Sequence, residues 1–261
     1  MKLKTVIYKK KEGIATISFN RPDKLNAQNR QLVSDFLNVL KQAESDTDIK
    51  AVIVKGEGRA FCSGDDLSED HTMDSMAKGF SVIEELQDTT RIIMRMPKPV
   101  IAAVHGYALG AGCEWAMNCD LRVAAEGTKF GFPEVRIGAT VTNAGTKMLP
   151  LLVGLARAKE LVFTTEMIDA AQAESWGLVN KVVPLEKLES EALKLAKKIT
   201  KNSNLAVALS KKALNQGVYQ GFEETLNQES RDILMVLQTL ESAQRAKTAL
   251  SATKKQKKEK E

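Results

Sequence analysis

Apolar residues near the amino end of the chain follow the two-residue period of β-strands. Thr5–Tyr8 and Ile14–Phe19 have this alternating, β-branched character, and the Glu12-Gly13 pair between them predicts the turn of a hairpin. Two further stretches are continuously apolar, which is typical of strands that are covered on both faces. These stretches are Ala51–Val54 and Val100–Val104.

Other stretches have the three-to-four-residue spacing of amphipathic helices. Over Gln28–Ala43 the apolar residues recur at this spacing, so we expect a helix there, with Asn26 as its N-cap. A longer helix is expected over Met76–Met96, because Pro97 and Pro99 would stop it. The chain therefore alternates strands with helices, which is the order of an α/β fold.

The same order of strand, glycine turn and helix recurs once more, through a strand at Leu121–Val123 and a helix over Ala144–Leu152. We therefore expect the first part of the chain to consist of stacked ββα units. From Leu185 onward the pattern is helical, with interruptions at Gly217 and Gly221. The expected organisation is an α/β core over residues 1–195, a helical subdomain over 196–253 and a charged tail over 254–261.

The composition is that of a folded, water-soluble chain. Its 261 residues are 43% hydrophobic, which is enough to fill the core of one sizeable domain. The formal net charge is +5, and the last eight residues, with five Lys and two Glu, supply +3 of it. Because this basic run lacks aromatic residues, a solvated tail is favoured over a nucleic-acid surface. Without an N-terminal apolar segment or a membrane-length apolar run, we expect a cytoplasmic protein.

The chain has three cysteines, Cys62, Cys113 and Cys119, an odd number that does not fit a disulfide framework. Their spacing to His71 and His105 is not that of metal ligands. We therefore expect reduced, mostly buried thiols and no metal ion.

A glycine-containing turn, Phe61–Leu67, follows the first continuous apolar strand. Gly64 permits a close approach of the backbone to a ligand. If the N–H of Asp65 points into a cleft, it is a hydrogen-bond donor that does not depend on the side chain. This segment taken alone leaves an ordinary turn with a helix cap as the alternative.

A second glycine-rich turn, His105–Glu114, lies between the Val100–Val104 strand and a helical run over Trp115–Asn118. The first N–H groups of a helix are unpaired and the helix dipole adds to their attraction for negative charge, so such a turn is a natural anion site. It offers the N–H of Ala111 and, three residues later, the carboxylate of Glu114. A dinucleotide site is disfavoured because the third glycine of that motif is missing.

A third segment, Phe130–Val135, places Glu134 among apolar and aromatic residues, directly after Pro133. Apolar surroundings disfavour a charged carboxylate and raise its pKa toward the range that is useful for proton transfer near neutral pH. A surface glutamate at a helix start is the alternative for this segment. The three segments together favour a site that stabilises an anionic oxygen and moves protons.

In this order and spacing, the segments FCSGDDL, HGYALGAGCEWAMNCDLRVA and KFGFPEVRIG closely resemble the enoyl-CoA hydratase/isomerase (crotonase) superfamily. FNRPDKLNA and VFTTEMIDAAQAESWGLVNKVVP are also similar to family signatures, so the resemblance runs from about residue 5 to residue 240. It implies an α/β fold, a ClpP-like spiral of repeated ββα units. It also implies a C-terminal helical region used in trimerisation.

The resemblance implies an acyl-CoA thioester as the substrate, with coenzyme A part of that substrate and no separate cofactor. The thioester oxygen would lie between the N–H groups of Asp65 and Ala111, and Glu114 and Glu134 would be the catalytic residues. The further substrate-binding residues expected from the same alignment are Gly64, Asp66, Leu67, Ser68 and Lys24, the last of them near the phosphates.

Isomerases of the family typically keep an acid only at the position of Glu134 or shift it. The presence of Glu114 as well therefore favours hydration of a trans-2-enoyl-CoA to a 3-hydroxyacyl-CoA. The alternatives are a double-bond isomerase and a non-catalytic acyl-CoA- or RNA-binding member of the fold. We expect a homotrimer or a dimer of trimers that binds neither membranes nor nucleic acid.

Overall fold

The chain divides into two compact units, Met1–Thr200 and Lys201–Glu261. The first unit holds both β-sheets and all residues of the predicted site. The computed structural model describes residues 3–69 and 76–218, together with Arg231, Met235, Thr239 and Gln244.

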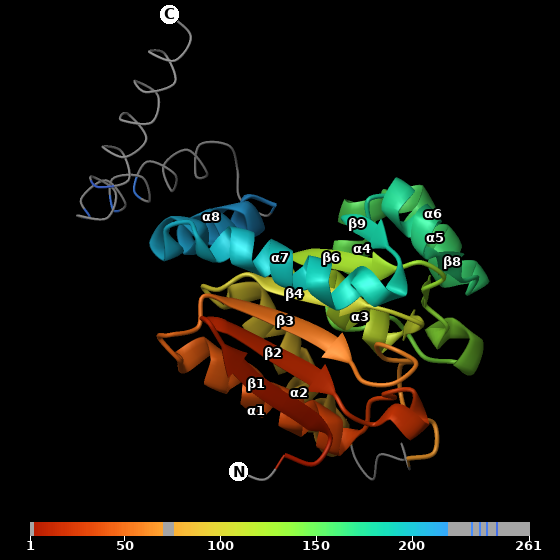
Figure 1. Cartoon of the computed structure of the whole chain (residues 1–261). Helices are drawn as coiled ribbons and strands as arrows, with labels where there is room; N and C mark the ends of the chain where they lie inside the picture. Colours follow the sequence, from red (N-terminus) through yellow and green to blue (C-terminus); the bar gives the residue numbers. More distant parts are fainter. Residues whose placement is uncertain are drawn as a thin grey trace, which may run out of the picture. The chain divides into compact units, whose positions relative to one another are not determined.

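Six strands form the main sheet, in the spatial order β1-β2-β3-β4-β6-β9 (Figure 1). β1 and β2 are antiparallel, which confirms the predicted hairpin, and all later neighbours are parallel. Because parallel strands end at the same edge, the loops that follow β3 and β4 meet there. The strands are β1 (Val6–Lys11), β2 (Ile14–Phe19), β3 (Ala51–Gly56), β4 (Val100–Val104), β6 (Leu121–Ala125) and β9 (Lys181–Val183).

Three short strands form a second sheet, in the order β5-β7-β8. β5 (Tyr107–Leu109) is parallel to β7 (Lys129–Gly131), which is antiparallel to β8 (Ile168–Asp169). A backbone bridge between Cys62 and Ala108 connects this sheet to the segment that follows β3. The second sheet therefore holds the two predicted glycine turns against each other.

Alternate side chains of the main sheet enter two separate apolar cores. In β3, Val52 and Val54 belong to one core, whereas Ala51 and Ile53 belong to the other. The predicted strands with two covered faces are thus confirmed. Two long helices are among those that pack on the first core, and another packs on the second (Figure 1). They are α1 (Arg30–Ser45) and α2 (Met76–Arg95) on the first, and α7 (Leu188–Thr200) on the second.

Helix α3 (Ala111–Asn118) is buried along its whole length. It begins four residues before the predicted run at Trp115, so Glu114 lies within the helix. The predicted helix over Ala144–Leu152 is confirmed as α4 (Gly145–Val153). The other helical elements of the first unit are α5 (Leu155–Thr164), α6 (Ala170–Ser175), η1 (Pro22–Lys24), η2 (Glu134–Ile137) and η3 (Leu185–Lys187).

The predicted N-cap of α1 is wrong. Asn29 caps the helix, since its Oδ1 accepts a hydrogen bond of 2.9 Å from the N–H of Leu32. Asn26 has a φ of 55° and is fully buried. Its side chain bonds to backbone groups of the neighbouring segments and is not available to the helix. These groups are Arg21 N, Glu57 O and Ala60 O.

The helical pattern after Leu185 is confirmed as far as the described residues reach, but it breaks where no break was predicted. α7 ends at Thr200, and α8 (Asn204–Gly217) begins in the second unit with Ser203 as its N-cap. The predicted division after residue 195 falls inside α7. Gly221 and the charged tail over 254–261 lie outside the described residues.

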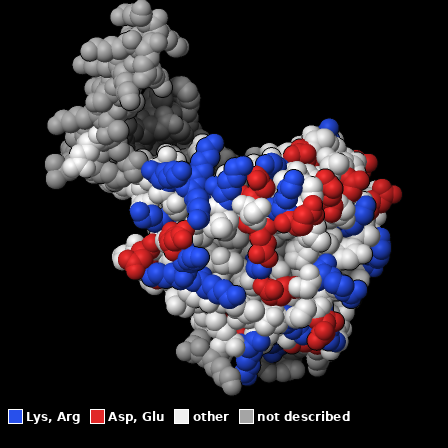
Figure 2. All heavy atoms as spheres, in the orientation of Figure 1, with Lys and Arg blue, Asp and Glu red and all other residues white. Residues whose placement is uncertain are grey.

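Surface charge, helix length and the cysteines bear on three classes of function that the sequence disfavours, which are nucleic-acid binding, membrane insertion and metal binding. On the face in Figure 2, Lys and Arg side chains lie among Asp and Glu side chains. None of the helices in the described ranges combines the length and the apolar character that crossing a bilayer requires. Cys62, Cys113 and Cys119 are free and buried, as predicted.

Candidate active site

The two glycine turns are joined by main-chain hydrogen bonds. The N–H of Cys62 donates to the carbonyl of Tyr107 over 3.0 Å, and the N–H of Leu109 donates to the carbonyl of Cys62 over 3.1 Å. Main-chain pairing of this kind fixes the register of the two segments whatever their side chains are. The turn at Gly64 and the turn at Gly110 therefore lie side by side.

The N–H of Asp65 points away from the segment of Gln28, with which the residues on either side of it pair. The N–H of Gln28 donates to the carbonyl of Gly64 over 2.7 Å, and the N–H of Asp66 donates to the carbonyl of Gln28 over 2.8 Å. In such a parallel bridge the residue between these two peptides directs its own N–H to the other side. Within residues 3–69 and 76–218 this N–H meets no acceptor. It is a donor available to a ligand.

The N–H of Ala111 is a second available donor. Ala111 is the first residue of α3, and its N–H is one of the unpaired groups of a helix start. Gly110 precedes it with a φ of 50° and ψ of −126°, a backbone conformation open to glycine. The turn is held in place because the N–H of Gly110 donates to the carbonyl of Gly131 over 2.9 Å.

The absence of side chains at two glycines lets the turns and an acid come together. A Cβ added at Gly110 would lie 3.8 Å from the Cα of Gly64 and 3.1 Å from Oε1 of Glu134. A Cβ added at Gly64 would lie 3.0 Å from the carbonyl oxygen of Leu109. The two donors and the carboxylate of Glu134 therefore share one small region.

Glu114 is 1% exposed, and its carboxylate accepts three hydrogen bonds. Oε1 accepts from the N–H of Thr142 at 2.6 Å. Oε2 accepts from Oγ1 of Thr142 at 3.1 Å and from Nδ2 of Asn143 at 2.8 Å. Burial raises the pKa of Glu114, while these donors act in the opposite direction by favouring the carboxylate.

Glu134 begins η2 and has different surroundings. Both carboxylate oxygens are buried, and neither has a hydrogen-bond partner in the described part of the chain. Burial raises the pKa of Glu134 to about 7, and the charges of Glu114 and Asp65 act in the same direction. A group with this pKa exchanges its proton readily near neutral pH. The predicted effect of apolar surroundings on this glutamate agrees with the structure.

Both glutamates are on the same side of the molecule. The charges of both glutamates also act on Cys113. Burial raises the pKa of that thiol, and the charges of Glu134 and Glu114 raise it further. Cys113 is thus kept as a neutral thiol, and the carboxylates whose charges act on one another here are Asp65, Glu114 and Glu134.

The other predicted substrate-binding residues differ from one another in how far they are exposed. Asp66 turns inward to an ion pair with Arg21, so its carboxylate is committed to the protein. Hydrogen bonds from Ser68 and the Arg21 guanidinium lower the pKa of Asp66 to about 2. Leu67 is 67% exposed, and Lys24 is an exposed residue at the end of η1.

Sequence reasoning missed four residues that support the site. Thr142 and Asn143 hold Glu114, while Gln28 and Arg21 hold the segment around Asp65. Their contacts join segments that are distant along the chain, so local spacing carries no signal for them. Of the four, only Arg21 lies in a segment that resembles a family signature, FNRPDKLNA.

This arrangement combines two main-chain donors with two carboxyl groups. Donors that converge on one point stabilise an oxygen that becomes negative during a reaction. The acids differ in hydrogen-bond surroundings, which suits them for opposite proton transfers. In the described ranges, no group of three His, Cys, Asp or Glu side chains is placed to hold a metal ion.

Comparison with known proteins gives the same assignment. The family model of enoyl-CoA hydratase/isomerase matches residues 9–259. The chain is 40% identical over 232 residues to the short-chain-enoyl-CoA hydratase of Clostridium acetobutylicum, and 39% identical over 232 residues to the crotonyl-CoA hydratase of Syntrophomonas wolfei; each match covers 88% of both proteins. An enoyl-CoA hydratase structure from Bacillus anthracis aligns with a TM-score of 0.89 at 32% identity, over 97% of both chains. The chain therefore belongs to the enoyl-CoA hydratase/isomerase family.

Proposed function

We propose that this protein adds water to a trans-2-enoyl-CoA and forms the 3-hydroxyacyl-CoA. The observation that carries the proposal is the pair of N–H groups at Asp65 and Ala111, which meet no acceptor in the described part of the chain, beside buried Glu114 and the buried carboxylate of Glu134. The relatives named as short-chain-enoyl-CoA and crotonyl-CoA hydratases support the same reaction and a short acyl chain.

The two N–H groups would stabilise the charge that forms during the addition. When the oxygen of water bonds to C3 of the conjugated thioester, electron density moves to the thioester oxygen. A pre-arranged donor at such an oxygen contributes about 2.7–4 kcal/mol to the transition state, or roughly a hundredfold to a thousandfold in rate. The donors at 65 and 111 would act on the transition state more than on the substrate.

The surroundings of the two glutamates assign their roles. Three donors favour the charged form of Glu114, so it would hold the water and accept one of its protons. Among the described residues no side chain or backbone group of this kind bonds to the carboxylate of Glu134, whose pKa is about 7, so it would donate a proton to C2. One proton leaves the water and one reaches C2, and solvent exchange restores both acids.

Several finer expectations belong to the same proposal. Following the family resemblance, we infer a spiral of ββα units, a C-terminal region that trimerises, and a homotrimer or dimer of trimers. No cofactor beyond the coenzyme A of the substrate, no nucleic acid and a cytoplasmic location are part of this inference. Lys24 would meet a phosphate group of coenzyme A, and Gly64–Ser68 would line the substrate path.

The test is incubation with crotonyl-CoA and with a 3-enoyl-CoA, while the absorbance of the conjugated thioester is followed. Glu134→Gln should nearly abolish turnover of either substrate, with a loss of about 10²- to 10⁴-fold expected for a proton-transfer group. Glu114→Gln should damage hydration more than movement of the double bond. Glu189→Gln, on the exposed surface of α7, is the matched control and should keep full activity.

Three results would contradict the proposal in different ways. Turnover of the 3-enoyl-CoA without hydration of crotonyl-CoA would identify a double-bond isomerase. Full activity of Glu114→Gln and Glu134→Gln would refute the assignment of the catalytic residues. Binding of thioesters without any turnover would favour a non-catalytic acyl-CoA-binding protein.

A further inference from the structure

The segment from Arg21 to Gln28 touches the loop of Asp65 at several points but takes no part in the chemistry above. Gln28 pairs with Gly64 and Asp66 through the main chain, and the N–H of Ser63 donates to the carbonyl of Leu25 over 3.1 Å. Such main-chain pairing controls the direction of the N–H at position 65. What holds this segment in turn is a set of side chains.

The strongest of these side-chain contacts is a buried ion pair. Nη2 of Arg21 lies 2.7 Å from Oδ2 of Asp66, and the two side chains are 16% and 7% exposed. A second guanidinium nitrogen, Nη1, donates to the carbonyl of Ala27. Because Arg21 bonds to both Ala27 and Asp66, it ties the segment before Gln28 to the residue after Asp65.

The pair is anchored on its other side by Asn26. Oδ1 of Asn26 accepts from the N–H of Arg21 at 2.8 Å, and Nδ2 donates to the carbonyl of Ala60 at 2.7 Å. Asp66 is further held by the N–H of Ser68 at 3.1 Å. The ion pair thus has little freedom, and any change in it is passed to the peptide between Asp65 and Asp66.

We propose that Arg21 and Asp66 are positioning residues, which aim the N–H of Asp65 at the thioester oxygen through their buried ion pair. The inference rests on the proposed function, because it assumes that this N–H stabilises an oxyanion. Neither side chain need touch the substrate. Asp66 is the neighbour of the donor and is buried, whereas Asp65 itself is exposed.

The expected effect is on the transition state and hardly on binding. Removal of one partner leaves the other charge buried without its counterpart, so the local backbone shifts to rehydrate it. A displacement of about 1 Å at a catalytic group can lower a rate by roughly a hundredfold. The contact with the oxygen tightens only as charge develops, so kcat should fall while KM stays nearly constant.

The test compares Arg21→Met, Asp66→Asn and the double variant in the hydration of crotonyl-CoA. We expect each single variant to lower kcat by roughly 10- to 100-fold. The double variant should lose no more than the worse single variant, since the pair acts as one unit. Arg21→Lys keeps the charge without the planar fork, and its kcat should lie between those of the wild type and Arg21→Met.

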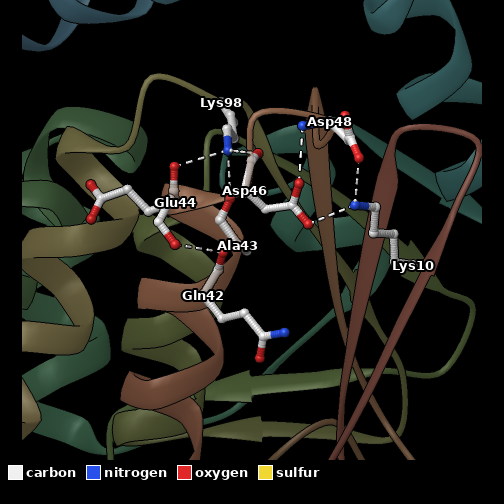
Figure 3. Close-up of polar contacts among 8 residues, drawn as sticks. Lys10, Gln42, Ala43, Glu44, Asp46, Asp48 and Lys98 are labelled. Carbon is white, nitrogen blue, oxygen red and sulfur yellow. Dashed lines mark hydrogen bonds and ion pairs between the residues drawn. The ribbon is translucent and has the colours of Figure 1, made fainter.

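Lys98 supplies a matched control for loss of a partly buried cation. Its Nζ donates to three main-chain carbonyls near the end of α1, as Figure 3 shows, at distances of 2.6 Å, 2.9 Å and 2.5 Å. The three carbonyls are those of Ala43, Glu44 and Asp46. They precede β3, at the edge of the sheet opposite the site. Lys98→Met should lower Tm and leave kcat unchanged.

The outcomes separate the inference from the proposed function. If the wild type hydrates crotonyl-CoA, a loss of kcat in Arg21→Met no larger than in Lys98→Met would overturn the inference alone. Independent, multiplicative losses from the two single variants would overturn it as well.

If the wild type hydrates no thioester, the proposed function fails and binding decides the inference. The probe is then acetoacetyl-CoA, whose enolate carries negative charge on the thioester side, measured against free CoA by calorimetry. The quantity compared is the affinity for acetoacetyl-CoA divided by the affinity for free CoA. A smaller value of this ratio in Arg21→Met than in the wild type supports the inference, and an unchanged value overturns it.

Discussion

Asp65 contributes to the site in two opposite ways. In the proposed mechanism its N–H would donate to the developing negative charge, while its own carboxylate adds negative charge and helps to raise the pKa of both Glu114 and Glu134. The amide of Gln28 donates to Oδ1 of Asp65 and so fixes that carboxylate. The side chain at position 65 therefore adds to the effect of burial on the pKa of the two acids, whereas the peptide at the same position would stabilise the proposed oxyanion.

This division predicts a shift in the pH dependence of kcat/KM. If Glu134 donates the proton to C2, as proposed, activity should fall as the pH rises through its pKa of about 7. Asp65→Asn removes a negative charge that raises this pKa, so the alkaline limb should move to lower pH. The measurement is a pH profile of crotonyl-CoA hydration.

The control for this prediction is Asp48→Asn, which removes a carboxylate that pairs with Lys10. Asp48 lies before the start of β3, whereas the site lies beyond the end of that strand. Its profile should coincide with that of the wild type. A profile of Asp65→Asn that moves to higher pH would contradict the electrostatic role of Asp65.

The distance between the two donors is set by how α3 meets the segment after β3. Gly112, in the first turn of α3, faces Cys62 so closely that an added Cβ would lie 2.2 Å from its carbonyl oxygen. The helix start and the loop of Asp65 therefore touch through main-chain atoms. A side chain at this contact would push the two elements apart.

Gly112→Ala should therefore lower kcat by about 10²-fold, because it moves the N–H groups of Asp65 and Ala111 apart, so that both can no longer reach the thioester oxygen. It should also lower Tm, since the added Cβ meets main-chain atoms, which cannot move aside without distorting the backbone. The control is Gly127→Ala, where a Cβ meets nothing within 4 Å and only the φ of 76° is strained. That variant should lose stability without losing kcat.

The burial of Glu134 should be visible in the stability of the whole molecule. Its folded pKa of about 7 exceeds the ordinary value of 4.5 for a glutamate, so between these values the folded chain holds a proton that the unfolded chain has released. Stability therefore falls as the pH rises from about 5 to about 8. Glu134→Gln removes this term, on the order of 1–3 kcal/mol.

Thermal unfolding at the two pH values measures the effect. The Tm of Glu134→Gln should exceed that of the wild type at about pH 8, and the excess should be small at about pH 5. Glu189→Gln, on the surface of α7, should follow the wild type at both values. An excess that is larger at the acidic pH would mean that Glu134 is charged in the folded protein.

Sequence patterns predicted the parts of the molecule that depend on local spacing. The strands with two covered faces follow from continuous apolar runs, and the long helices α1 and α2 follow from apolar residues at helical spacing. β5, β7 and β8 have three residues or fewer, which is too short for any period to appear. The choice between Asn26 and Asn29 as a cap depended on contacts with distant carbonyls, which local spacing does not contain.

The glycine turns and the acids of the site were predictable because their chemistry is local. Gly64, Gly110 and Glu134 each stand in a short segment whose composition is unusual for a plain loop. The partners of Glu114 were not predictable, since Thr142 and Asn143 reach it from the segment before α4. A hydrogen bond across 28 or 29 positions leaves no pattern in a single sequence.

The bridge between Gln28 and Asp65 has a consequence for how this protein can diverge. The group that would stabilise the oxyanion belongs to the peptide, so exchange of the residue at 65 alters polarity and shape while the donor survives. Only proline would delete it. Position 65 can thus change in sequence while the proposed donor persists, and a library of substitutions there should retain turnover at every residue except proline.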